Sequence, residues 1–166
     1  MGSQYGFDRV CRAGVAALIA AGLLTAAVQA APQGSGSLEF MVDGQKVASD
    51  VWTFARFSKT DFNLTSNMHR DKRTLLLNLR NPQPGKPLAL GSMSSGNYGT
   101  YYAAYGKQDT AYQITSGTVT FTELDMAKRT FSATFELSAT GPSGSKVTIS
   151  NGVVRNGKIG NDQLIN

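Results

Sequence analysis

The chain has 166 residues, a formal net charge of +5 at pH 7, a single cysteine and a single histidine. This length suits one domain with a core of its own, and the lone cysteine excludes a disulfide framework and thiolate metal sites. The modest positive charge permits weak attraction to anionic molecules without selecting one class of them. We expect no metal ion, no cofactor and no nucleic-acid partner.

Residues 1–30 have the features of a secretory signal peptide. Arg9 and Arg12 precede an apolar run over residues 13–28, and small residues before position 31 form a cleavage site. The run is shorter than the ~20 residues that span a bilayer comfortably, so an uncleaved membrane anchor is the less favoured alternative. We expect cleavage after Ala30.

Cys11 lies in front of the apolar run, whereas the lipid-bearing cysteine of a lipoprotein comes directly after it. The sequence therefore predicts no lipid anchor. Residues 31–166 are expected to form a single exported domain, periplasmic or secreted, with no membrane span once the signal peptide is removed.

The N-terminal half of the mature chain alternates apolar and polar residues with the period of two that β-strands have. Strands are predicted at Ser37–Val42, at residues 51–57, around Phe62, Leu64 and Met68, and at Thr74–Arg80. The pair Asp43-Gly44 predicts a tight turn after the first strand. Three prolines in residues 81–87 exclude a central strand there and predict a surface connection.

Residues 69–73, HRDKR, are the densest basic stretch and lie between two predicted strands. A charged turn is the simpler interpretation, because short basic clusters at turns are mostly solvated surface. A binding site for a polyanion is the alternative.

The C-terminal half has the clearest pattern. Residues 118–122 alternate threonine with valine and phenylalanine, and residues 131–139 alternate phenylalanine, alanine and leucine with serine, threonine and glutamate. A short turn over residues 125–128 joins the two runs into a predicted antiparallel hairpin. Another strand is expected after the turn at residues 141–144.

No segment of the mature chain shows ten or more residues with a convincing helical period. The predicted fold class is all-β, with an antiparallel β-sandwich or a closed barrel of about eight strands, because sheet stacking or closure hides exposed strand edges. Alternation does not choose between these two architectures.

Several short motifs occur in order along nearly the whole mature chain. They are FMVDG at 40–44, SGNY at 95–98, SGTVTF at 116–121, LD at 124–125, TFSATF at 130–135 and VTISNGV at 147–153. With these motifs the chain resembles an uncharacterised family of exported bacterial all-β domains, a domain of unknown function common in Bacteroidota lipoproteins. The resemblance implies the all-β fold and export, but it transfers no activity and no functional residues. Two departures are the missing lipoprotein cysteine and Ser132-Ala133-Thr134, which replaces a glycine of the family.

Residues suited to catalysis are scarce. His69 is the only histidine and is expected in an exposed turn, and no G-x-S-x-G motif supplies a serine nucleophile. Glu123 and Glu136 fall on neighbouring strands of the predicted hairpin, where a solvated strand face explains them without glycosidase chemistry. We therefore expect a protein that is not an enzyme and has no catalytic residues.

Tyrosines gather between residues 98 and 112, and a tyrosine joins an apolar ring to a hydrogen-bonding tip. The candidate ligand-binding residues are Trp52, Tyr98, Tyr101, Tyr102 and Tyr105. In the alternative, Tyr101 and Tyr105 face one side of a strand and Tyr102 the other, and the rings only pack on the sheet.

Two functions are compatible with these patterns. The first is a non-catalytic binding module for a small apolar ligand or a glycan, held at a barrel mouth or sheet face near the tyrosines. The second is a structural or interaction domain that docks on another exported protein. A deep cavity favours the first function, and a filled core with a flat exposed apolar patch favours the second.

Overall fold

The computed structural model of this protein describes residues 36–49, 53–57, 61–66 and 72–160. The predicted signal peptide (1–30), Trp52, Met68 and His69 lie outside the described residues. Ten strands and two short 3-10 helices make up the described part of the chain. The strands are β1 (Ser37–Val42), β2 (Gln45–Ser49), β3 (Thr53–Phe57), β4 (Asp61–Ser66), β5 (Thr74–Arg80), β6 (Pro87–Leu90), β7 (Tyr98–Tyr102), β8 (Ala111–Asp125), β9 (Thr130–Thr140) and β10 (Lys146–Ile159). The 3-10 helices are η1 (Met93–Ser95) and η2 (Gln108–Thr110).

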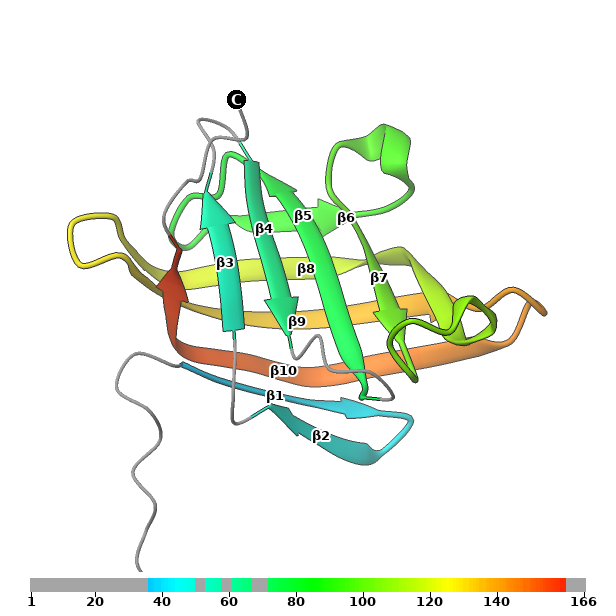
Figure 1. Ribbon diagram of the computed structural model, residues 1–166. Coiled ribbons are helices and arrows are strands. Elements are labelled where there is room, and N and C mark those ends of the chain that lie inside the picture. The colour runs from blue at the N-terminus through cyan, green and yellow to red at the C-terminus, as the bar shows by residue number, and fades with distance from the viewer. Residues whose placement is uncertain (1–35, 50–52, 58–60, 67–71, 161–166) are drawn as a thin grey trace, which may run out of the picture.

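The strands form one sheet that wraps round on itself. β10 pairs with β3, the sheet continues through β4, β5, β7 and β8, and β9 pairs with both β8 and β10. These pairings return to their starting strand and make a flattened barrel, while the hairpin β2–β1 and the strand β6 branch from it. Figure 1 shows β3, β4, β5 and β7 in a front layer that crosses β8, β9 and β10 behind it. The predicted all-β antiparallel fold is confirmed, with one parallel pair, β10 with β3, that was not predicted.

The core lies between the two layers. Alternate residues of β9 are buried, from Phe131 to Ala139, as the period of two predicts, and Leu75, Leu77 and Leu79 of β5 are buried as well. Phe62 of β4 joins the layers, because its ring meets those of Phe121 and Phe131 edge-on. The interior among the described residues is therefore occupied by packed aromatic and aliphatic side chains.

Turns and edges follow the local sequence. Asp43 and Gly44 have positive φ angles of 48° and 81°, as the predicted tight turn between β1 and β2 requires. β6 begins at Pro87 and pairs only with β8 among the described strands, which is where a proline is tolerated in a sheet. The predicted surface connection therefore ends in a short edge strand.

β8 changes its partner along one edge. Residues 111–113 pair with β7, and residues 117–120 pair with β6. On this edge no described strand pairs with Ile114, Thr115 or Ser116, although β9 continues along the other edge with a bulge at Thr115. The gap between β6 and β7 positions the site described next.

Candidate functional site

The five candidate binding residues do not form one cluster. Tyr98 and Tyr102 are half-buried at opposite ends of β7, Tyr101 is buried, Tyr105 lies in the loop that follows, and Trp52 lies outside the described residues. Tyr98 and Tyr102 share the outward face of β7 but are four residues apart, which is about 13 Å along a strand. The structure thus brings Tyr102 and Tyr105 together, and it places Tyr98 away from them at the other end of β7.

Tyr101 is part of the core. Only 2% of it is exposed, its ring stands edge-on to Phe40 with centroids 6.2 Å apart, and it also meets Tyr112 at 6.0 Å. Burial raises the pKa of the Tyr101 phenol, and the nearby positive charge of Arg73 partly opposes that rise. In this conformation Tyr101 supports the sheet and offers no surface to a ligand.

Tyr102 and Tyr105 form an edge-on pair with ring centroids 5.5 Å apart. β7 ends at Tyr102, so the alternative in which Tyr101 and Tyr105 share one face of a strand is wrong. The backbone N–H of Tyr105 instead donates to the carbonyl of Lys72 at 3.0 Å, and the Thr110 hydroxyl accepts from the Ala104 N–H at 3.1 Å. These bonds fold the loop back toward the start of β5.

Tyr98 lines a surface groove of about 520 Å³ between β6 and β7. Its lining includes Ile114 and Thr115, on the stretch of β8 that has no described partner on this side. Met93 of η1 also lines the groove, and 72% of it is exposed. The groove is lined by Gly91, Ser92, Met93, Tyr98, Gly99, Gln113, Ile114 and Thr115.

The η1 loop beside the groove is held by one asparagine. The side-chain NH2 group of Asn97 donates to the backbone carbonyl of Ala89 at 3.2 Å. The side-chain oxygen Oδ1 of Asn97 accepts from the backbone N–H of Arg80 at 2.8 Å. The Ser95 hydroxyl lies 2.7 Å from the carbonyls of Ser92 and Asn97. The loop is therefore tied to both β5 and β6, and the groove is formed before any ligand arrives.

The groove combines apolar and polar groups. Tyr98 and Met93 supply apolar surface, while serine, threonine and glutamine side chains supply hydrogen-bonding groups. Thr100 Oγ1 donates to Gln113 Oε1 at 3.1 Å, and this bond orients the Gln113 amide. The NH2 group of the same amide donates to no protein group of the described residues. An aromatic ring beside a fixed amide donor suits a ligand with one apolar face and several hydroxyl groups.

β7 packs closely against β5 at Gly99, which also lines the groove. A Cβ at this position would lie 2.5 Å from Leu77 Cδ2 and 2.6 Å from the carbonyl oxygen of Leu76. Only a residue without a side chain fits here, so Gly99 allows β7 to pack this close to β5 next to Tyr98.

Glu123 and Glu136, the acidic residues on neighbouring strands of the hairpin, do not form a catalytic pair. Glu123 is exposed opposite Ser132, and Glu136 is exposed opposite Thr118, so the two carboxyl groups do not face each other across the hairpin. Glu136 Oε1 accepts a hydrogen bond of 2.7 Å from the backbone N–H of Asn151. Glu136 therefore supports the bulge of β10.

The described residues hold neither a cluster of metal ligands nor a membrane-spanning helix. No three histidine, cysteine, aspartate or glutamate residues in the described ranges lie close enough together to hold a metal ion. No helix in the same ranges is both long and apolar enough to cross a membrane.

Sequence reasoning identified Tyr98 but missed Met93 and Gln113. Residues 91–97 are small and polar apart from Met93, and they carry no periodic signal. Gln113 lies at the point where β8 leaves β7, and that point depends on the pairing of distant strands. Only an exposed methionine in a polar loop could have drawn attention to this place.

Comparisons of the chain with protein-family models, with curated proteins and with solved structures found no match. The resemblance to an exported bacterial family therefore stays a prediction that rests on the motifs alone.

Proposed function

We propose that this protein is an exported, non-catalytic binding module that holds a glycan in the groove beside Tyr98. The observation that carries this proposal is the combination, in one preformed groove, of the Tyr98 ring with the fixed amide of Gln113. A sugar presents an apolar C–H face to an aromatic ring and hydroxyl groups to polar side chains.

A glycan fits the groove better than a small apolar molecule does. An apolar ligand gains affinity by leaving water, and its binding sites enclose most of its surface. The groove is open at the surface and does not enclose a cavity, so a ligand here would remain partly in contact with solvent. The packed interior among the described residues also favours a surface ligand over one inside the barrel.

The predicted export supports the same proposal. The predicted signal peptide would place the domain in the periplasm or outside the cell, where a glycan outside the cytoplasm can reach it. The residues suited to acid-base catalysis do not converge on the groove, since its lining contains no carboxylate and no histidine among the described residues. Binding without hydrolysis is therefore the activity proposed.

A docking function is the second candidate, and β2 is the observation that favours it. β2 lies at the end of the strand order and pairs only with β1 among the described strands. An open strand edge can accept a strand of a partner protein.

The glycan proposal is tested by screening residues 31–166 against an array of oligosaccharides and measuring the best binder by calorimetry. Tyr98→Ala should weaken binding by about threefold to tenfold, since a stacked ring contributes 0.5–1.5 kcal/mol, and Tyr98→Phe should retain most of the affinity. Tyr105→Ala removes a half-buried tyrosine outside the groove and is the matched control. Absence of any binder, or equal weakening by Tyr98→Ala and Tyr105→Ala, would overturn the proposal.

A further inference from the structure

A second hollow, of about 440 Å³, lies beyond the opposite end of β7 from the Tyr98 groove. Its lining comes from the edge strand β2 and from the two residues that precede β5. These residues are Gln45, Lys46, Val47, Ala48, Lys72 and Arg73. Three of the six are cations, and they come from parts of the chain that are far apart in sequence.

Arg73 is oriented by an uncharged partner. Its Nη2 atom donates to Gln45 Oε1 at 3.0 Å, which holds the guanidinium against β2 without neutralising it. The charge also reaches the core, because it partly offsets the rise in the pKa of Tyr101 that burial causes. Arg73 is half-buried, so its charge is less screened by solvent than that of a fully exposed arginine.

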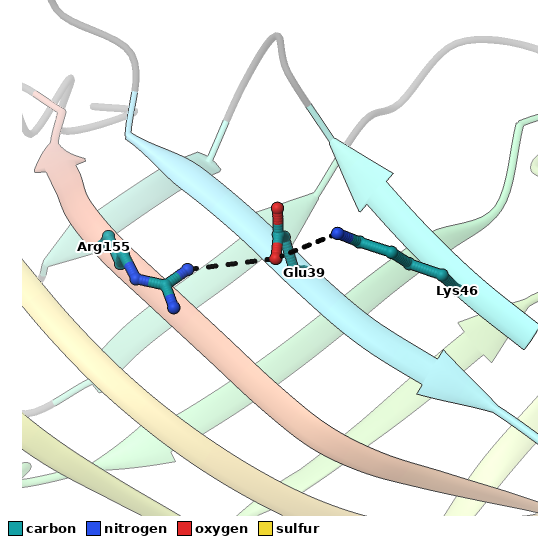
Figure 2. Close-up of polar contacts among 3 residues, drawn as sticks. All are labelled: Glu39, Lys46 and Arg155. Carbon is teal, nitrogen blue, oxygen red and sulfur yellow. Dashed lines mark ion pairs between the residues drawn. The ribbon is translucent and has the colours of Figure 1, made fainter. Parts of the chain in front are cut away.

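Few carboxylates among the described residues lie near the cations that line the hollow. Lys46 Nζ lies 3.3 Å from a Glu39 carboxylate oxygen, and Arg155 lies 3.9 Å from the same oxygen (Figure 2). Glu39 is thus paired with two cations on the outer face of β1. Asp43, in the turn between β1 and β2, accepts the backbone N–H of Thr148 at 2.8 Å.

Lys72 and Arg73 make no ion pair with any carboxylate of the described residues. Two cations that have no ion pair among the described residues therefore line the hollow, and Lys46, whose ammonium group is paired with Glu39, lines it as well. Two charges match a dianion better than a single carboxylate. The fixed arginine fork and the mobile lysine ammonium groups are the donors that tetrahedral oxyanions use in proteins.

We propose that this hollow is a binding site for a tetrahedral dianion, a phosphate or sulfate group. Arg73, held by Gln45, donates to the anion, and Lys72 supplies further charge and N–H donors, while Lys46 adds positive charge at the rim from its pair with Glu39. The site is separate from the Tyr98 groove and does not depend on the glycan proposal, because no residue lines both.

The test is a titration of ¹⁵N-labelled residues 31–166 with sodium sulfate and with sodium phosphate, at ionic strength kept constant with chloride. The amide signals of residues 45–48 and 72–73 should shift and saturate. Arg73→Gln should weaken binding by about tenfold or more, as expected for loss of a charged hydrogen bond. Lys158→Gln, which removes an exposed cation on the far part of β10, should leave binding unchanged.

Gln45→Glu is the decisive variant. It is nearly isosteric and places a carboxylate against the Arg73 guanidinium, so the fold and the contact remain while the charge of the hollow falls. We expect unchanged or higher thermal stability together with about tenfold weaker sulfate binding or none. Binding by this variant as tight as that of the unmodified protein would overturn the proposal.

The source of the group is distinguished by a parallel titration with a sulfated disaccharide and with its unsulfated form. Saturable shifts with inorganic sulfate indicate a site for the free ion. Shifts at the same residues with the sulfated disaccharide alone indicate a site for the group carried on a sugar. No saturable shift at residues 45–48 and 72–73 with any of these anions would show that the hollow is not an oxyanion site.

Discussion

The ring of Phe135 lies so close to Gly152 that a Cβ on this glycine would stand 2.2 Å from two ring carbons. The two residues are paired across β9 and β10, at a bulge where Asn151 has a φ angle of 53°. The same arrangement occurs further along β10, where a Cβ at Gly157 would lie 2.4 Å from the ring of Phe131. Two bulges in β10 thus make room for the two rings that β9 contributes to the core.

Gly152→Ala should lower the free energy of unfolding by about 1–3 kcal/mol, because the added methyl group overpacks a rigid ring. Urea denaturation measures the change. In a Phe135→Leu background the same substitution should cost less, since the ring that meets the methyl group is gone. Equal costs in both backgrounds would show that the ring is not the cause.

Phe62→Ala should lower the free energy of unfolding by about 3–5 kcal/mol, the usual cost of truncating a buried phenylalanine. The ring of Phe62 lies 4.9 Å from that of Phe121 and 4.8 Å from that of Phe131, centroid to centroid, and so connects the two layers. Phe62→Leu keeps most of the volume and should cost less. A loss below about 1 kcal/mol for the alanine variant would contradict the packing described here.

Glu39→Gln should change the free energy of unfolding by no more than about 1 kcal/mol, although Glu39 contacts both Lys46 and Arg155 (Figure 2). The reason is exposure, since all three side chains are more than 40% exposed and their attraction is screened by water. Denaturation at low and at high salt should give nearly the same small difference. A large loss confined to low salt would indicate a stronger network.

Tyr101 should make stability depend on alkaline pH. Burial raises the pKa of its phenol above the usual 10.0, so the folded state holds this proton more tightly than the unfolded state does. The resulting stabilisation is fully present below about pH 10 and is lost as the pH rises through the folded-state pKa. Tyr101→Phe cannot lose a proton, so its stability relative to the unmodified protein should improve as the pH rises above about 10. A difference that does not vary with pH would contradict this.

Asp125 should titrate below its usual 3.8. The backbone N–H of Lys128 donates to Asp125 Oδ1 at 2.8 Å, and this bond, followed by the Lys128 ammonium group, lowers the pKa of the carboxyl. The stabilisation is present above the unfolded-state pKa and is lost as the pH falls through the folded-state pKa. The amide proton of Lys128 should shift with the carboxyl signal in an NMR titration. Lys128→Met should raise the pKa only in part, because the backbone donor stays in place.

Local sequence was sufficient for the strands that carry most of the core. Residues 131–139 alternate so strictly that their buried and exposed sides follow from the geometry of a single strand. The same holds for the leucines of β5 and for the Asp43-Gly44 turn, whose positive φ angles are a property of adjacent residues. These features need no knowledge of which strands become neighbours.

The sequence alone did not decide whether the pair Asn151-Gly152 forms a turn or a bulge. Asn151-Gly152 reads equally well as a turn, yet β10 continues through it as a single strand with a bulge. The rings of β9 select the bulge, because only a glycine beneath Phe135 allows the two strands to pair. That choice depends on a partner strand and cannot be made from one segment.

The sequence by itself determined that this protein is built from β-strands with a phenylalanine- and leucine-rich inner face, because a period of two is written into each strand separately. Only the tertiary structure decided that the sheet closes through β10 and β3, that Tyr101 is buried while Tyr98 borders a groove, and that Lys46, Lys72 and Arg73 line one hollow. Each of these depends on pairing between strands distant in the chain. Such pairing is set by the packing of the whole core, which no local pattern records.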